Sequence, residues 1–444
     1  MNGTMNKTYY IETFGCQMNK NDSELMALSM LEHGFERAAD IDHADFAIFN
    51  TCSVREHAEN RAISRIKSIR KKIGKRNGFL VVAGCMAQRL GRELIENNIT
   101  DVVIGPYQSP EIGLAIDNFL KDNRQAEFLS MDINDFSGRI NPRLSNLRDD
   151  PEWHRWVTIT HGCENFCSYC VVPFVRGRLI SSPSADILDY IRGLAAQGVR
   201  EITLLGQNVN QYGSDSDDMP FYRLLETAAC IDGIERINFL TSHPKDFSHD
   251  ILLVMRDHPN ISRSIHLPLQ SASNRILGLM NRHYTYSQYL QLVENIRKHL
   301  HSHSLSTDII VGFPGETVGE FEYTLAALKH IRFDDAFTYA FSSRQGTPAS
   351  TLDESIPPDE KLERLKQLIV LQRSISRQKL RERIDGVEDT IIERFSKKSS
   401  DEVMGRTYLN HIVIMPGTAS DIGKKYKIRI SGVRGATLQG TKIA

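Results

Sequence analysis

Three cysteines lie close together near the middle of the chain, in the run HGCENFCSYC. Cys163, Cys167 and Cys170 have the spacing Cys-x₃-Cys-x₂-Cys and directly follow the strand-like segment WVTIT. Thiolates this close in sequence can bind one metal centre without any long-range folding. Cubane iron–sulfur clusters usually take four cysteines, so a loop that supplies three leaves one iron with an open coordination site. The spacing therefore predicts an open [4Fe–4S] cluster.

An open iron in such a loop is typical of a site for S-adenosylmethionine (SAM), whose amino and carboxylate groups can chelate the free iron. Reduction of the cluster then cleaves a C–S bond of SAM. Tyr169, just before the last cysteine, is expected to pack near the adenine of SAM. The alternative is a zinc knuckle with His161 as a fourth ligand. We favour the iron–sulfur interpretation because the motif opens a series of alternating strands and helices.

Three further cysteines occupy equivalent places in the first part of the chain. Cys16 follows YYIETFG, Cys52 follows FAIFNT and Cys85 follows FLVVAG, each between a strand-like and a helix-like segment. In a parallel sheet these positions converge at one edge, where helix N-termini also stabilise thiolates. The alternative is three unrelated buried cysteines. We favour a second open cluster, and we interpret Cys230, in TAACIDG, as a core residue.

Polar residues also follow several strand-like segments of the second part of the chain. If these strands form a barrel, their ends face a common site. The residues expected near SAM, each with a structural role as the alternative, are Gly206, Gln207, Ser242, His243, Gln270 and Asp308. Glu316, in VGFPGET, is expected to cap the helix that follows it.

Basic residues are concentrated in two segments. Residues 61–76 contain eight Lys or Arg and no acid, and residues 381–444 contain 12 basic and 8 acidic residues. A face of one sign is typical of a surface that binds a polyanion such as RNA. Arg176 and Arg178, in the run VRGR, are expected either to hold a phosphate or to pair with acids in the barrel mouth. The predicted RNA contacts are Lys71, Lys72, Arg176, Arg178, Arg406, Lys424 and Lys425.

The elements that position these residues divide the chain into successive parts. After a disordered start (1–6), residues 7–125 alternate strands with helices, which predicts a Rossmann-like parallel α/β domain. Its first helix, SELMALSMLEHG, is expected to start at a cap from Asp22 or Ser23 and to end at Gly34. Residues 126–150 are polar and irregular, as in a linker.

Residues 151–378 repeat the strand-then-helix pattern about six times. This pattern predicts a partial (β/α)₆ barrel, although a doubly wound sheet has the same linear order. Residues 379–444 contain short β-like pieces separated by Gly and Pro, which predicts a small all-β barrel. The predicted class is therefore α/β with a C-terminal β-barrel.

The composition is that of a globular protein without membrane-spanning segments. The chain has 444 residues, of which 41% are hydrophobic and 25% charged, with a formal net charge of −1. Its start has no apolar segment of a signal peptide, so we expect a cytoplasmic protein with no membrane partner. We also expect a monomer. In a reducing compartment its seven cysteines are expected to be metal ligands or core residues rather than disulfides.

The motifs together resemble the methylthiotransferase family of radical SAM enzymes across essentially the whole chain. The residues that carry the resemblance are TFGCQMNKNDSE, NTCSVRE and GCMAQR in the first part, and GCENFCSYCVVPFVRGR, GQNVNQYG, TSHP and DIIVGFPGET in the second. GRT (405–407) and the basic segment after it are similar to a TRAM domain, a tRNA-binding appendage. CQMN and NTCSVR resemble the branch that acts on N6-isopentenyladenosine in tRNA. The branches that act on threonylcarbamoyladenosine or on a ribosomal-protein aspartate are the alternative.

This resemblance implies a tRNA methylthiotransferase that uses two [4Fe–4S] clusters, held by the two cysteine trios, and two SAM molecules per turnover. One SAM would methylate a sulfur on the auxiliary cluster, and the other would be cleaved to a 5′-deoxyadenosyl radical. The product would be a methylthio group at C2 of the isopentenyladenosine beside the anticodon. The implied partners are the tRNA, a low-potential electron donor such as flavodoxin or ferredoxin, and a sulfur source. The chain departs from the family at Ala272 and His283, where Gly is usual, and in ERFSKKS (393–399).

Overall fold

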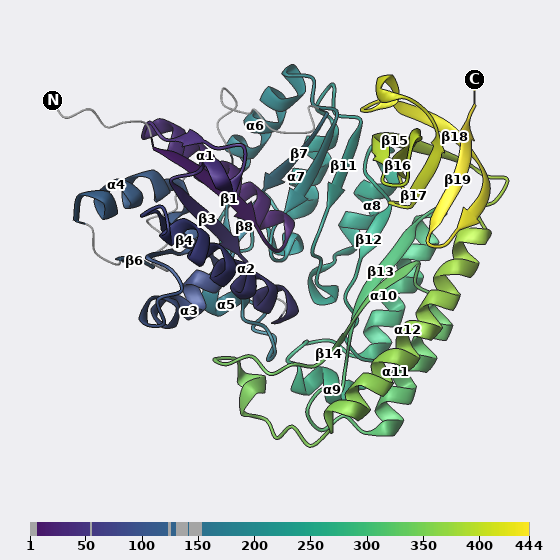
Figure 1. The fold of residues 1–444 in the computed structure, drawn as a ribbon. Helices are drawn as coiled ribbons and strands as arrows, with labels where there is room; N and C mark the ends of the chain where they lie inside the picture. Colours follow the sequence, from purple (N-terminus) through teal and green to yellow (C-terminus); the bar gives the residue numbers. More distant parts are fainter. Residues whose placement is uncertain (1–6, 54–55, 123–125, 130–140, 142–152, 444) are drawn as a thin grey trace.

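The computed structural model describes residues 7–53, 56–122, 126–129, 141 and 153–443. Three units follow one another along the chain: an α/β domain, a larger open α/β barrel, and a small β-barrel (Figure 1). The predicted disordered start and most of the predicted linker lie outside the described residues. Among the residues described, no helix is long and apolar enough to cross a membrane.

The first domain is built on a six-stranded parallel sheet in the order β2-β1-β3-β4-β5-β6. Its strands are β1 Thr8–Thr13, β2 Glu36–Arg37, β3 Phe46–Thr51, β4 Phe79–Gly84, β5 Val102–Ile104 and β6 Ala126–Phe128. The central strands β3 and β4 are apolar runs, which suits strands covered by helices on both faces. β6 pairs with β5, so the sheet extends past the predicted boundary at residue 125.

Helices on both faces cover this sheet. They are α1 Gln17–Glu32, α2 Glu56–Gly74, α3 Cys85–Glu96 and α4 Ile112–Asp122, with the short 3₁₀ turns η1 Ile41–His43 and η2 Pro106–Glu111. The prediction of a cap at Asp22 or Ser23 is wrong, because α1 begins at Gln17 and Asp22 lies buried within it. The prediction that this helix ends at Gly34 is confirmed. Gly34 has φ +79°, and the Phe35 N–H donates to the Met30 carbonyl at 3.0 Å.

The second domain contains six parallel strands in sequence order. They are β7 His154–Thr158, β10 Glu201–Leu205, β11 Arg236–Phe239, β12 Ser264–His266, β13 Ser304–Val311 and β14 Asp335–Ala340. A parallel bridge between Ile237 and Ile261 joins β11 to the segment before β12. Because each crossover moves one strand in the same direction, the sheet is an open six-stranded barrel and not a doubly wound sheet. A two-stranded ladder, β8 Thr160–His161 with β9 Ile180–Ser181, frames the cysteine loop.

Helices cover the outer face of the barrel, and α12 runs along β14 toward the C-terminal unit (Figure 1). The helices are α5 Val172–Val175, α6 Ser184–Ala196, α7 Phe221–Ala229, α8 His249–Asp257, α9 Asn274–Leu279, α10 Tyr286–His299, α11 Val318–Ile331 and α12 Pro358–Arg381, with 3₁₀ turns η5 Val209–Gln211, η6 Pro244–Asp246 and η7 Pro348–Thr351. Except for α5, their apolar faces and side chains of the strands contribute to one continuous core. α5 instead packs through Val175 against Cys85, at the start of α3 in the first domain.

The third unit is a closed five-stranded barrel in the order β15-β16-β17-β19-β18. Its elements are β15 Val387–Ser396, β16 Ser399–Thr407, β17 Ile412–Pro416, η8 Ala419–Asp421, β18 Lys425–Arg434 and β19 Thr437–Lys442. It docks on the N-terminal ends of the larger barrel's strands. There Arg236, buried and paired with Glu201 at 2.6 Å, donates to the carbonyl oxygens of Arg406 and Thr407. The predicted fold class is confirmed in all three units.

Candidate functional site

The loop between β8 and α5 carries Cys163, Cys167 and Cys170 at the C-terminal end of β7. The Cys170 N–H donates to the Cys167 carbonyl at 2.9 Å, and the Val172 N–H points at Cys170 Sγ at 3.4 Å. Burial raises the pKa of Cys163 to about 11 and that of Cys170 to about 12, and the neighbouring Cys167 adds to both shifts. Burial therefore disfavours the thiolate form of Cys163 and Cys170, and a nearby cation would stabilise it.

Arg282 lies against this loop, and sequence reasoning missed it. Its Nη1 donates to Cys167 Sγ at 3.2 Å and to the Tyr169 hydroxyl at 3.3 Å. The side chain is buried, with 4% of the residue exposed. A local signal exists in the sequence, because Arg282 directly precedes His283, one of the positions at which the chain departs from the family pattern. A buried guanidinium on a cysteine sulfur is suited to stabilise an anionic cluster.

The other trio meets at the C-terminal edge of the first sheet. Cys16 precedes the first turn of α1, Cys52 follows β3, and Cys85 is the first residue of α3. A hydrogen bond with Cys52 is the largest of several influences that lower the pKa of Cys16 to about 6, whereas burial raises the pKa of Cys85. Asn19, fully buried, donates to the Phe14 and Thr51 carbonyls and so ties together the loops that carry Cys16 and Cys52.

Arg176 joins the two cysteine regions. From the end of α5 its Nε donates to Cys85 Sγ at 3.2 Å, and its Nη2 donates to Asp22 of α1 at 2.5 Å. The Tyr107 hydroxyl donates to the Arg176 carbonyl at 2.7 Å. Only 2% of Arg176 is exposed, so the prediction that it contacts RNA is wrong. The guanidinium instead pairs with a buried acid, which was the other reading of VRGR, although that acid comes from the first domain.

Neither trio is assembled as a metal site in its present side-chain positions. Within the described residues, no group of three or more His, Cys, Asp or Glu side chains stands close enough to hold a metal ion. The structure brings each trio to one loop or one sheet edge, and the role of the cysteines as ligands stays a prediction. Cys230 is exposed at the end of α7, so its interpretation as a core residue is wrong.

A large cavity of about 2370 Å³ connects the two regions. Cys16, Cys52 and Cys170 line it, and it continues through the open barrel to Arg406 and Asn410 of the C-terminal unit. A cavity of this size is larger than most small-molecule pockets, which occupy about 300–1,000 Å³. It can therefore admit part of a macromolecule in addition to a cofactor.

The predicted SAM contacts divide into two groups. Tyr169, Gln270 and Asp308 line the cavity. Asp308 Oδ2 lies 3.2 Å from Nε2 of His266. The other predicted contacts lie at neighbouring strand ends but are not among the residues that line the cavity: Gly206, Gln207, Ser242 and His243. Burial lowers the pKa of His243 to about 2, so its ring is neutral at physiological pH.

Several buried polar atoms at these strand ends have no hydrogen-bond partner among the described residues. They include Gln207 Oε1, His243 Nε2 and Gln270 Oε1. Gln270 has φ +67° and Thr241, also on the cavity wall, has φ +69°. Backbone strain and unsatisfied buried groups are typical of places where a ligand completes the structure. The strand ends therefore fit a polar cofactor.

The predicted basic surface is only partly free. Lys71 is exposed in the last turn of α2, whereas Lys72 pairs with Asp42 at 2.7 Å. Arg65 pairs with Glu12 at 3.1 Å, so acids from other elements offset part of this face. In the C-terminal unit and the cysteine loop the remaining predicted contacts are accessible to solvent: Arg178, Lys424 and Lys425 are exposed, and Arg406 is half-buried beside Glu393.

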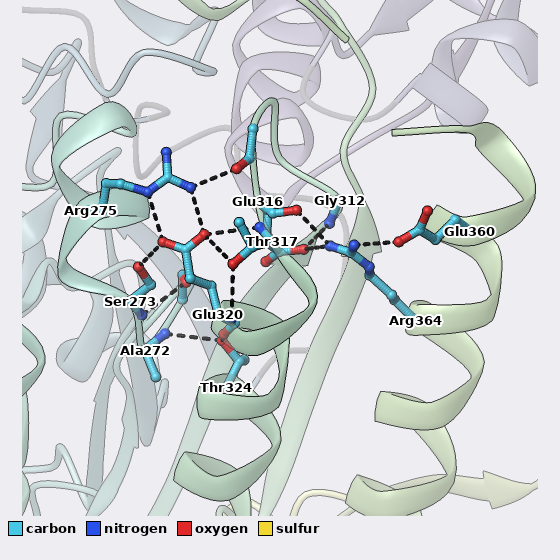
Figure 2. A network of polar contacts seen from close by, with 12 residues as sticks. Ala272, Ser273, Arg275, Gly312, Glu316, Thr317, Glu320, Thr324, Glu360 and Arg364 are labelled. Atoms are coloured by element: carbon cyan, nitrogen blue, oxygen red, sulfur yellow. Dashed lines mark hydrogen bonds and ion pairs between the residues drawn. The ribbon is translucent and has the colours of Figure 1, made fainter. Parts of the chain in front are cut away.

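A polar network fixes the VGFPGET turn on the barrel rim (Figure 2). The prediction that Glu316 caps α11 is wrong, since Thr317 and Glu320 form the capping box. The Glu316 carboxylate instead accepts from the Gly312 N–H at 2.7 Å and from Arg364 of α12 at 2.8 Å. Burial raises the pKa of Glu316, and those two contacts oppose the rise.

The two departures from the family pattern differ in their consequences. The Ala272 N–H donates to Thr324 Oγ1 at 3.2 Å, and the residue has no left-handed backbone conformation. His283 has φ +56°, a conformation that glycine adopts without strain. The substitution at 283 therefore strains the turn beside Arg282, whereas the one at 272 does not.

Comparison with known proteins covers all three units. The models described as uncharacterized protein family UPF0004, radical SAM superfamily and TRAM domain match residues 8–105, 157–328 and 387–443. A protein of Acetivibrio thermocellus named tRNA-2-methylthio-N(6)-dimethylallyladenosine synthase is 40% identical over 445 residues, which cover 98% of this chain and 91% of the relative. A protein of the same name from Carboxydothermus hydrogenoformans is 39% identical over 443 residues, covering 98% and 99%.

Among solved structures, the radical S-adenosylmethionine methyltransferase TsrM from Kitasatospora setae superposes with a TM-score of 0.57. The two chains are 14% identical, and the match covers 78% of this chain and 75% of the other. At this identity the likeness concerns the fold alone.

Proposed function

This chain belongs to the tRNA-2-methylthio-N(6)-dimethylallyladenosine synthase family of radical SAM enzymes, and we propose that it transfers a methylthio group to C2 of N6-isopentenyladenosine in tRNA. The proposal places an open [4Fe–4S] cluster on Cys163, Cys167 and Cys170. A second cluster of the same kind is assigned to Cys16, Cys52 and Cys85. The adenosine is the one beside the anticodon, and the TRAM barrel contributes to tRNA binding.

One observation carries the proposal: cysteines of both trios open onto the same cavity, which also reaches the C-terminal barrel. Inserting sulfur at an unactivated C–H bond requires a radical source and a sulfur donor that both reach the same substrate atom. A single cavity lined by Cys170 and also by Cys16 and Cys52 provides that arrangement. A single-cluster enzyme would need only one of these two sets of cysteines.

The residues present fit the groups that the family implies. Each trio offers three thiols, and Gly15 leaves room beside Cys52 that a Cβ would fill, since it would come within 2.3 Å of the Cys52 Cβ. Backbone and guanidinium N–H groups already point at Cys85, Cys167 and Cys170. When bound, the clusters and SAM supply the chemistry of radical generation, methyl transfer and sulfur donation.

The chain's own residues then bind, orient and shield the reactants. Gln270 lines the cavity, and its Oε1 is a buried acceptor with no hydrogen-bond partner among the described residues, which suits a donor group of SAM. Tyr169, half-buried beside Cys170, offers an aromatic face to the adenine of SAM. Arg176 bonds to Tyr107 and to Asp22 of the first domain, and so ties together the two domains that carry the cysteine trios.

The substrate side of the cavity combines an aromatic ring with polar groups. Phe337 of β14 is 46% exposed although it lines the cavity, and the His266 ring meets it edge-on at 5.7 Å. His266 in turn contacts Asp308 and Ser306. An exposed aromatic face can stack on an extruded base, and the polar groups can meet its edge.

The proposal is tested by anaerobic reconstitution with iron and sulfide, followed by incubation with SAM, dithionite and isopentenylated tRNA. Nucleoside mass spectrometry is expected to detect 2-methylthio-N6-isopentenyladenosine, and the reconstituted chain is expected to hold about eight irons. Full product formation by a variant in which Cys16, Cys52 and Cys85 are all alanine would refute the two-cluster assignment. A methylthio group found only on threonylcarbamoyladenosine would instead assign the chain to the branch of the family that acts on that nucleoside.

A further inference from the structure

Each cysteine trio has one buried arginine that donates to one of its sulfur atoms. Arg176 Nε lies 3.2 Å from Cys85 Sγ, and Arg282 Nη1 lies 3.2 Å from Cys167 Sγ. The two arginines are 2% and 4% exposed. Because the donor type, the distance and the burial are alike, any difference in their effect must come from their other neighbours.

Arg176 is neutralised by an acid. Its Nη2 meets Asp22 Oδ2 at 2.5 Å, and Asp22 is fully buried. Burial raises the pKa of Asp22, but protonation would leave a buried guanidinium unpaired, which is costly. The pair thus presents almost no net charge to this trio.

Arg282 has no such partner. Its remaining contacts are the hydroxyls of Tyr169 and Tyr284 and the Pro268 carbonyl. In the part of the chain that the structure describes, no carboxylate lies within ion-pair distance of it. An acid does act on Cys163, namely Asp246, but it is itself paired with Lys245 at 3.1 Å. This trio therefore faces an unneutralised positive charge.

A charge beside a cluster changes how readily the cluster accepts an electron. Reduction of [4Fe–4S]²⁺ to [4Fe–4S]⁺ adds one negative charge, which a nearby cation stabilises and a nearby anion destabilises. Hydrogen bonds to the sulfurs act in the same sense as a cation. In a buried site these interactions are only weakly screened by water and salt.

We infer that Asp22 holds the auxiliary cluster at a lower reduction potential, while Arg282 raises that of the SAM cluster, so that a single incoming electron is directed to the SAM cluster. The inference rests on the proposed function, because it requires a cluster on each trio. The electron comes from a low-potential one-electron donor, which is oxidised by one electron, and no bond forms or breaks in this step. Asp22 and Arg282 are positioning residues here, since neither would contact the substrate.

The test measures the potential of each cluster alone in the full-length chain. Replacing Cys163, Cys167 and Cys170 by alanine leaves the auxiliary cluster, and replacing Cys16, Cys52 and Cys85 leaves the SAM cluster. Potentiometric titration followed by electron paramagnetic resonance gives the midpoint. In the first background Asp22→Asn is expected to raise the ratio of reduced to oxidised cluster at a fixed potential about tenfold, about 59 mV for a one-electron couple. In the second, Arg282→Gln is expected to lower that ratio about tenfold, and Arg282→Lys to restore part of it.

Further variants keep the test decisive. Arg176→Gln in the first background is expected to lower the potential, opposite to Asp22→Asn. Glu316→Gln is the matched control, because it removes an equally buried, arginine-paired carboxylate from the network of Figure 2, whose contacts include no cysteine. It should shift neither midpoint. An unchanged or lowered midpoint in Asp22→Asn, or shifts of the same sign in Asp22→Asn and Arg176→Gln, would overturn the inference. Failure of the proposed function is distinguishable, since it would appear as missing iron in the parent backgrounds or as missing product from the unmodified enzyme.

Discussion

Replacing Gly15 with alanine should remove the auxiliary cluster and leave the SAM cluster in place. Gly15 has φ +117° and precedes Cys16, so the backbone conformation alone disfavours any other residue, by about 1–3 kcal/mol. A Cβ at this position would lie 2.3 Å from Cys52 Cβ and 3.1 Å from Cys52 Sγ. Carbon atoms in contact are normally about 3.5–4.0 Å apart, so the two cysteine loops must separate by about 1 Å or more. Metal sites tolerate departures of only about 0.2 Å in ligand distance.

The assay is iron and sulfide analysis after anaerobic reconstitution, with the nucleoside product measured in parallel. The iron content is expected to fall from about eight to about four per chain, with loss of the methylthio product. Reductive cleavage of SAM should persist, because Cys163, Cys167 and Cys170 are untouched. A spectrum that shows the cluster on Cys163, Cys167 and Cys170 intact would indicate that the variant is folded.

Gly34→Ala is the matched control. Gly34 also has a left-handed backbone, with φ +79°, but a Cβ there meets no atom within 4 Å and lies away from the cysteines. It should lose stability without losing iron. If Gly15→Ala retains about eight irons and full product formation, the steric reasoning and the placement of the second cluster are both refuted. Equal iron loss in both variants would attribute the effect to backbone strain alone.

Further predictions concern stability and tRNA binding. His283→Gly should raise the free energy of unfolding by about 0.5–1 kcal/mol, because φ +56° no longer strains the turn; an unchanged or lower melting temperature contradicts this. Burial would raise the pKa of Asp334, but a hydrogen bond from His411 and the ammonium of Lys379 at 2.7 Å lower it to about 2. Since the folded-state pKa is below the ordinary value of about 3.9, this stabilisation of about 2 kcal/mol is present above pH 4 and lost as the pH falls toward 2. Asp334→Asn should flatten the fall of the melting temperature between pH 4 and pH 2, measured by thermal denaturation at a series of pH values. Lys71→Glu should weaken tRNA binding while iron content stays unchanged. It should also reduce, by about 1, the slope of the logarithm of the binding constant against the logarithm of the salt concentration. An unaltered slope would show that Lys71 does not contact the tRNA.

Much of the fold follows from local patterns in the sequence. The apolar runs FAIFN and FLVVAG predicted β3 and β4, and the repeated strand-then-helix order predicted the six parallel strands of the barrel. The linear order did not separate an open barrel from a doubly wound sheet. That distinction depends on which strands pair, and the bridge from Ile237 to Ile261 decides it.

The wrong predictions for Asp22 and Arg176 have a common physical origin. Asp22 was expected at a helix start and Arg176 at a phosphate, because each was judged from its sequence neighbours. The two side chains meet across 154 positions of the chain, and Arg282 meets Cys167 across 115. Buried ion pairs of this kind carry no local periodicity, and a single polar residue in a turn has the same sequence appearance whether it faces water or a core.

The sequence by itself determined which atoms could do the chemistry: one compact trio of cysteines, and a second trio distributed over three strand ends. Spacing and periodicity carry this information because a strand end has a fixed relation to the helix that follows it. Only the tertiary structure decided that both trios face one cavity and that each has a buried arginine, one neutralised by Asp22 and the other not. The reason is that charge compensation depends on distances between side chains far apart in the sequence, for Arg176 even in different domains, and these distances exist only after the chain has packed.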